Sequence, residues 1–80
     1  MKSPAIEVEC YSGGRADERP RRVVIDGREY LIARLLGTTI EERSDSRERV
    51  QRFRVLTDSG SIIELVRESD SSWRLVSIGG

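Results

Sequence analysis

The residues that most often carry enzymatic chemistry are nearly missing from this sequence. Its 80 residues include no histidine and a single cysteine, Cys10. Without histidine there is no ordinary Ser-His or Cys-His nucleophile pair and no imidazole ligand for a metal, and one thiol cannot form a zinc cluster. We therefore expect no catalytic residues, no metal ligands and no cofactor.

The carboxylates do not suggest an acid–base pair either. Glu41 and Glu42 are adjacent, so in a strand they face opposite sides of the sheet. Glu7 and Glu9 share a face, but alternating polar positions are typical of the solvated side of a strand. Cys10 falls on the apolar side of that strand, which is typical of a buried structural thiol. The sequence therefore predicts a protein that is not an enzyme.

Arginine is the functional residue type that the chain does offer. Its 14 basic residues balance 14 acidic ones, and thirteen of the basic residues are arginine. Five arginines lie within residues 43–54 against two carboxylates, and a second group lies near residue 21. The candidate contacts are Arg43, Arg47, Arg49, Arg52, Arg54, Arg21 and Arg22.

Two interpretations of these arginines remain open. Guanidinium groups bind phosphate, so the clusters could form a weak, salt-sensitive nucleic-acid site. The favoured interpretation is a solvated face with cross-strand ion pairs, each of which contributes less than about 1 kcal/mol. Few exposed aromatic residues are expected for base stacking, which weakens the first interpretation.

The elements that position these residues are predicted to be strands. Apolar and polar residues alternate over 6–10, and a second strand is predicted over 21–25. Asp26-Gly27 follows, and this dipeptide favours a type I′ hairpin turn because both central residues need positive φ. Further strands are expected at about 50–57, 61–68 and 73–78, with polar loops at 43–49 and 69–72.

Residues 28–42 are the ambiguous segment. Residues 28–36 are rich in helix formers, and Gly37 could end a helix. A type I′ turn, however, requires an antiparallel strand to follow it. We favour one long strand from Arg28 to Glu42 that bends at Gly37, with a short helix over 28–36 as the alternative.

The loop before residue 61 determines the register of the two strands around it. A three-residue loop that ends in a left-handed Gly60 places Phe53 opposite Leu65. A two-residue loop would instead place the apolar Val55 opposite Glu64. Because cross-strand neighbours on a buried face should both be apolar, the three-residue loop is predicted.

These elements predict an all-β fold in a single domain over residues 1–80. About six antiparallel strands in meander order would form a strongly coiled sheet or a small SH3-like barrel, since closure removes exposed edges. Residues 1–4 and 79–80 are expected to fray. The predicted core residues are Ile6, Val8, Val23, Ile25, Tyr30, Ile32, Phe53, Val55, Ile63, Leu65, Trp73 and Leu75.

The opposite face of the predicted sheet is not wholly polar. Val24, Leu56, Ile62 and Val66 point away from the core residues. Either the sheet curls to cover these four side chains, or they form an apolar patch on which a protein partner docks.

Composition limits the setting of the protein. A chain of 80 residues is near the lower end of what folds without a metal or a disulfide. Its apolar runs are too short to span a membrane, its first residues lack the apolar core of a signal peptide, and its cysteine is unpaired in sequence. We expect a cytoplasmic protein that does not bind membranes and is a monomer or a weak homodimer.

From Pro20 onward, strand ends and turns follow a recognisable pattern. Its residues are Pro20, Val23, Asp26-Gly27, Tyr30, Phe53-Arg54-Val55, Asp58, Gly60, Leu65, Arg67, Trp73 and Leu75. The pattern resembles the small all-β domain that closes the catalytically inactive, polymerase-like accessory proteins of bacterial mutagenesis cassettes, and it is similar to that of short stand-alone bacterial proteins. Thr38-Thr39-Ile40 stands where that domain has paired tryptophans. The resemblance implies a non-catalytic adaptor that works near DNA repair or translesion synthesis.

The leading hypothesis is therefore a non-catalytic module that binds a protein partner through a sheet edge or through the apolar patch. The alternative is a weak nucleic-acid-binding β domain that uses the arginine clusters.

Overall fold

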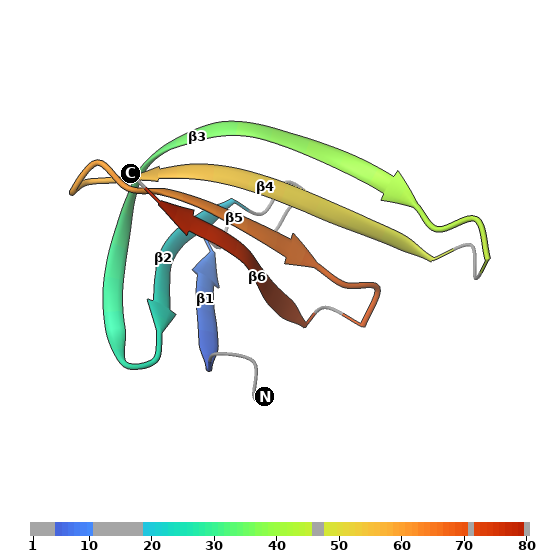
Figure 1. Ribbon diagram of the computed structural model, residues 1–80, viewed down its shortest axis with the longest axis horizontal. Coiled ribbons are helices and arrows are strands. Elements are labelled where there is room, and N and C mark those ends of the chain that lie inside the picture. The colour runs from blue at the N-terminus through green and yellow to red at the C-terminus, as the bar shows by residue number, and fades with distance from the viewer. Residues whose placement is uncertain (1–4, 11–18, 46–47, 71, 80) are drawn as a thin grey trace.

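The computed structural model describes residues 5–10, 19–45, 48–70 and 72–79. These residues form six antiparallel strands, and each strand pairs with the next one in the chain (Figure 1). The strands are β1 Ile6–Cys10, β2 Pro20–Ile25, β3 Arg28–Glu42, β4 Arg49–Thr57, β5 Ile62–Arg67 and β6 Trp73–Gly79.

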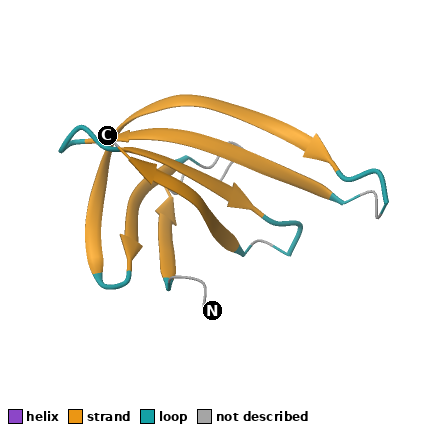
Figure 2. Cartoon of the chain, viewed as in Figure 1, coloured by secondary structure: helices purple, strands orange, loops and turns teal. Residues whose placement is uncertain are grey.

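The sheet is strongly curled into a half-barrel, and the described residues contain no helix (Figure 2). The curl brings β1 toward β6, although no ladder joins the described residues of these two strands. The predicted all-β meander with a strongly coiled sheet is therefore correct.

The turn between β2 and β3 has the predicted geometry. Asp26 and Gly27 have φ angles of 49° and 82°, as a type I′ turn requires. The turn also holds the start of β1, because the Asp26 amide donates to the Ala5 carbonyl at 2.8 Å and the Ala5 amide donates to Asp26 Oδ1 at 3.0 Å. One dipeptide thus links the first three strands.

β3 is a single bent strand of 15 residues, so the alternative of a helix over 28–36 is wrong. Its residues 28–31 pair with β2, and its residues 32–42 pair with β4. The β3–β4 ladder shifts register between Ile32 and Arg34 and again between Leu35 and Gly37. These irregularities lie where the strand changes its partner, because an extra residue bends a strand and increases its twist.

The loop between β4 and β5 also matches its prediction. Gly60 has a φ of 93°, and Phe53 pairs with Leu65 while Arg54 pairs with Glu64. Thr57, which is buried, organises the loop: its side-chain oxygen accepts from the Ser61 amide at 2.9 Å. The three-residue loop therefore determines which face of β5 is buried.

A small apolar core lies on the concave side of the sheet. Its fully buried members are Val23, Phe53, Val55, Ile63 and Leu65. The half-buried side chains packed against them are Ile6, Val8, Ile25, Tyr30, Ile32, Leu35, Trp73 and Leu75. All twelve predicted core residues are in these two groups, and Leu35 is an addition that the sequence did not indicate.

The last hairpin adds an aromatic contact to this core. The Trp73 ring lies 5.3 Å from the Phe53 ring at 45°, and the Arg67 guanidinium lies 5.8 Å from the Trp73 ring.

In the loop before β6, hydrogen bonds from the Ser72 hydroxyl and amide lower the pKa of the Asp70 carboxyl.

Fraying of residues 79–80 is wrong for Gly79. This residue ends β6 and pairs with Ile62. Residues 1–4 and Gly80 lie outside the described residues, so the rest of that expectation stays a prediction.

Replacing Gly60 with valine should lower the free energy of unfolding by about 1–2 kcal/mol, because a β-branched residue resists positive φ. Nothing lies within 4 Å of a Cβ at this position, so the loss would come from the backbone alone. Gly37→Val is the matched control, since Gly37 also has free space but no positive φ. Urea unfolding of both variants checks this. Equal stabilities would contradict the left-handed turn.

Replacing Phe53 with alanine should cost about 3–5 kcal/mol, because the ring is fully buried and its removal leaves a cavity. Trp73→Ala should cost less, about 2 kcal/mol, because the indole is only half-buried against the core. Thermal or urea unfolding monitored by circular dichroism measures both. A larger loss of stability for Trp73→Ala than for Phe53→Ala would contradict the position of Phe53 at the centre of the core.

Candidate interaction surface

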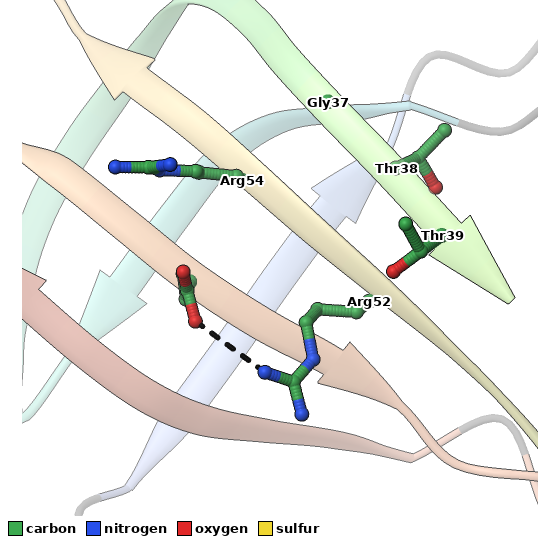
Figure 3. Close-up of a pocket in the computed structure, with 6 residues that line it drawn as sticks. Gly37, Thr38, Thr39, Arg52 and Arg54 are labelled. Atoms are coloured by element: carbon green, nitrogen blue, oxygen red, sulfur yellow. Dashed lines mark ion pairs between the residues drawn. The ribbon is translucent and has the colours of Figure 1, made fainter. Parts of the chain in front are cut away.

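The convex face of β4 carries a shallow depression of about 230 Å³ (Figure 3). Three neighbouring strands contribute to it, because β4 lies between β3 and β5. Its lining residues are Gly37, Thr38, Thr39, Arg52, Arg54 and Glu64. Two of the arginines singled out from the sequence therefore share one hollow.

Arg52 is held between two carboxylates in this depression. Its Nε lies 3.4 Å from Glu41 Oε1 on β3, and its Nη1 lies 3.7 Å from Glu64 Oε2 on β5. Arg52 Nε is buried and makes no hydrogen bond. The guanidinium is thus neutralised by charge on both sides, in a geometry that leaves one donor unused.

Arg54 differs from its neighbour. It is exposed and lies directly opposite Glu64 in the ladder. The Glu64 carboxylate is nevertheless directed to Arg52, as the dashed line in Figure 3 shows, and the Arg54 side chain extends away from that pair. Within the described part of the chain, Arg54 has no ion pair.

A second arrangement of charges ties the β3–β4 connection to the β5–β6 connection. Glu68, whose side chain is 21% exposed, lies with Oε1 3.0 Å from Arg74 Nε and Oε2 3.2 Å from Arg43 Nη2. Arg43 Nη1 also lies 3.7 Å from Glu48 Oε2. One carboxylate therefore neutralises two guanidinium groups, one from the β3–β4 connection and one from strand β6.

Arg49 lies at the start of β4 and is only loosely paired. Its Nε is 4.0 Å from Glu42 Oε2, and both side chains are mostly exposed. Arg47 lies outside the described residues.

The arginines of β2 are paired in the same way. Arg22 donates to Glu29 on β3 and to Glu9 on β1, the latter at 3.4 Å, and Arg21 Nη1 lies 3.6 Å from Glu9 Oε1. The hydrogen bond and charge of Glu29 raise the pKa of the Arg22 guanidinium above its usual value. Glu7 and Glu9 share the outer face of β1, as the sequence indicated, and Glu9 serves there as a counter-charge.

Five of the seven candidate arginines consequently have carboxylate partners within 4.0 Å, namely Arg21, Arg22, Arg43, Arg49 and Arg52. Of the two interpretations of the arginine clusters, a face of ion pairs therefore describes these five residues. Contacts of this kind would have to be broken before the guanidinium groups could bind phosphate.

The apolar patch expected on the convex face does not form as one surface. Leu56 and Ile62 are half-buried ladder neighbours, whereas Val24 pairs with Glu29, five residues along β3 from the Leu56 partner Arg34. Val66 is 1% exposed and so contributes nothing to an exposed patch. Its ladder neighbours on both sides are the long side chains of Arg52 and Arg74, whose aliphatic parts can cover it.

The exposed apolar residues are different ones, which the sequence analysis missed. Among large apolar side chains of the described residues, the exposed ones are Leu31, Leu36, Ile40, Val76 and Ile78. Ile40 is the most exposed, at 68%. Both Ile40 and Leu36 lie in the second half of β3.

This second half of β3 has a free edge. β2 pairs only with residues 28–31, and no described segment pairs with residues 36–42 on the side away from β4. Figure 1 shows this part of β3 as the outermost strand of the long hairpin. The sequence already indicated this free edge, because the strand predicted at 28–42 is far longer than the one predicted at 21–25 and extends beyond it.

Three further features of the described residues concern metal ligands, the thiol and membrane-spanning helices. The described residues include no group of three His, Cys, Asp or Glu side chains able to hold a metal ion. Cys10 is half-buried, in keeping with its place on the apolar side of β1. No described helix is long and apolar enough to cross a membrane.

Comparisons of the chain with protein-family models, with curated proteins and with solved structures find no match. Function is therefore inferred from the chemistry of the surface.

Replacing Glu68 with glutamine should lower the free energy of unfolding by about 1 kcal/mol, because two guanidinium groups lose one shared carboxylate. Glu42→Gln is the matched control and should change stability little, since Glu42 is 57% exposed and lies 4.0 Å from Arg49. Urea unfolding at low and high NaCl measures both, and salt should reduce the Glu68→Gln effect. Equal losses of stability in the two variants would contradict an added contribution from the carboxylate that Arg43 and Arg74 share.

Proposed function

We propose that this chain is a non-catalytic protein-interaction module that receives an extended segment of its partner along the free edge of β3. The observation that supports this most directly is the edge itself, where no described segment pairs with residues 36–42 on the side away from β4 and Ile40 is 68% exposed. In an antiparallel ladder, alternate residues direct their backbone N–H and C=O groups to that side, where another strand can pair with them.

The composition of the edge supports the proposal. Charged residues make up 35% of the chain, yet residues 35–40, Leu-Leu-Gly-Thr-Thr-Ile, carry no charge. Exposed edges that avoid association usually contain lysine or another charged residue, or a proline. A stretch of edge without charge, here residues 36–40 with two exposed apolar side chains, is instead typical of an edge that pairs with another strand.

The state of the arginines favours protein over nucleic acid. Phosphate binding requires guanidinium groups that are free to exchange their counter-ions. Five of the candidate arginines already have carboxylate partners, and the formal net charge is zero. The long-range attraction that draws nucleic acid to basic domains is therefore weak.

We extend the proposal to a setting near DNA repair or translesion synthesis, which the resemblance to the mutagenesis accessory domain implies. Thr38-Thr39-Ile40, where the chain departs from that pattern, lies on the free edge of β3. A partner of this edge would thus differ from one that recognises paired tryptophans. Location of the gene beside mutagenesis genes would support this setting.

Ile40→Lys should abolish partner binding without unfolding the protein, because a lysine on an edge strand resists the approach of another strand. Val76→Lys is the matched control, since Val76 is also an exposed apolar residue but lies on β6. Quantitative capture from a native extract by the three immobilised proteins is the measurement. Proteins retained by wild type and Val76→Lys but lost with Ile40→Lys are the expected result. Equal retention by all three would contradict the use of this edge.

Labelled single- and double-stranded oligonucleotides provide the contrasting measurement. Titration at about 50 mM and 150 mM salt should show no binding at the higher concentration. Binding there that is lost in Arg54→Glu, the candidate arginine without an ion pair to another described residue, would favour the nucleic-acid alternative.

A further inference from the structure

We infer that the free edge of β3 recognises an extended segment with an acidic residue opposite Gly37 and an apolar residue opposite Ile40. The segment pairs antiparallel with residues 37–42, so its apolar residue precedes its acidic residue by three positions. This inference rests on the proposed function, because it uses the same edge and specifies what the edge recognises. It is carried by the side chains that border Gly37 on the convex face of the sheet.

A bulge in β3 places Arg34 and Gly37 on the same face. In the β3–β4 ladder, Arg34 pairs with Leu56, and Gly37 pairs with Arg54. Residues 54 and 56 are two positions apart on β4, so they and their ladder partners share the convex face. The register shift after Leu35 produces this arrangement, because without an extra residue positions 34 and 37 would face opposite sides.

Gly37 leaves a gap in the convex face between the free edge and Arg54. It has no side chain, and nothing lies within 4 Å of the place that a Cβ would take. The depression of about 230 Å³ opens at this point, with Gly37 and Arg54 among its lining residues (Figure 3). A side chain from an added strand therefore meets no obstacle as it crosses β3 toward Arg54.

Two guanidinium groups border this gap without a counter-charge among the described residues. Arg54 is exposed, and the carboxylate opposite it in the ladder, Glu64, is directed to Arg52. Arg34 is also exposed and forms no ion pair with a described residue. The gap is thus positively charged, which favours an acidic side chain at the partner position opposite Gly37.

The spacing of the strands allows this contact. Neighbouring strands lie about 4.8 Å apart, so the partner residue opposite Gly37 is about 9.6 Å from the Arg54 backbone. An arginine and a glutamate that extend toward each other span this separation. Arg54 reaches the gap by rotation about its own side-chain bonds, and it breaks no ion pair with a described residue in doing so. Arg34 lies diagonal to the same partner residue on the convex face.

The concave face sets a different requirement. Ile40 pairs with Gln51, and Thr38 pairs with Phe53, so both side chains of β3 lie on the face that carries the core. Ile40 is 68% exposed, and no described segment pairs with β3 beside it on the side away from β4. An apolar residue opposite Ile40 would remove apolar surface of both side chains from water.

The order of the two partner residues follows from the direction of the added strand. All ladders between the described strands are antiparallel, and antiparallel pairing is slightly more stable per residue than parallel pairing. The β3–β4 ladder has no register shift between Gly37 and Glu42, so alternate residues keep to one face there. An antiparallel partner therefore presents its apolar residue first, on the concave side, and its acidic residue three positions later, on the convex side.

A peptide titration tests the partner sequence. The probe is the hexapeptide Thr-Val-Thr-Thr-Glu-Thr, blocked at both ends, added to isotope-labelled protein and followed by amide resonances. We expect the largest shifts at residues 36–42. The same peptide with lysine in place of glutamate should bind roughly three- to tenfold more weakly. The reversed sequence, Thr-Glu-Thr-Thr-Val-Thr, should also bind more weakly. Equal affinity for the glutamate and lysine peptides, or tighter binding of the reversed peptide, would overturn the inference.

Two variants test the route across Gly37. Gly37→Val should reduce the preference for the glutamate peptide over the lysine peptide, because the new side chain stands between the partner residue and Arg54. The free space at this position allows the fold to accommodate it. Arg54→Glu should abolish the preference. Arg28→Glu is the matched control, since it makes the same change of net charge at the far end of β3 and should leave the preference intact. A preference that neither Gly37→Val nor Arg54→Glu changes would overturn the role of the gap.

The inference and the proposed function fail in different ways. Captured proteins that are lost with Ile40→Lys, together with equal binding of the glutamate and lysine peptides, would retain the edge as a docking site and overturn its selection of an acidic residue. Absence of resonance shifts at residues 36–42 with about 5 mM glutamate peptide would likewise overturn the inference alone. Insensitivity of both capture and glutamate-peptide binding to Ile40→Lys would overturn both proposals.

Discussion

The whole architecture depends on one strand that belongs to two ladders. β3 pairs over its first residues with β2 and over its remaining length with β4, and β2 is only 6 residues long against 15 for β3. A flat sheet cannot satisfy both ladders and also bury one apolar side, so β3 bends where it exchanges partners. The bend curls the sheet over its core, and the difference in strand length leaves the distal edge of β3 without a neighbour among the described strands.

Much of this could be predicted from local signals in the sequence. Asp26-Gly27 favours a type I′ turn, which needs positive φ at both central residues and an antiparallel return strand, and it therefore favoured a strand over a helix at 28–36. Gly60 similarly selects a three-residue loop, and a shift of one residue would turn Ile63 and Leu65 of β5 away from the core. Such features are predictable because one backbone conformation, permitted to few residue types, determines the pairing of a whole hairpin.

The surface was harder to predict because it depends on how long side chains select among several partners. Glu64 lies opposite Arg54 in the ladder, yet its carboxylate is nearer to the diagonal neighbour Arg52, which a second carboxylate from β3 also approaches. Val66 has the spacing of an exposed position, yet it is buried between arginines on the adjacent strands. Period-two alternation identifies a face, but not which residues of that face other side chains cover.

The distal part of β3 is free of the constraints that folding places on the rest of the strand. Tyr30, Ile32 and Leu35 pack against the core, and no residue of β3 beyond Leu35 does so. Residues 36–42 therefore contribute through their ladder with β4 and through polar side-chain contacts with that strand. Val23 or Phe53, in contrast, can hardly change without loss of a core this small. A stretch that folding does not require to be apolar nonetheless keeps Leu36 and Ile40 exposed in a chain rich in charge. The proposed contact with another polypeptide would give those two side chains a physical role that the isolated fold does not.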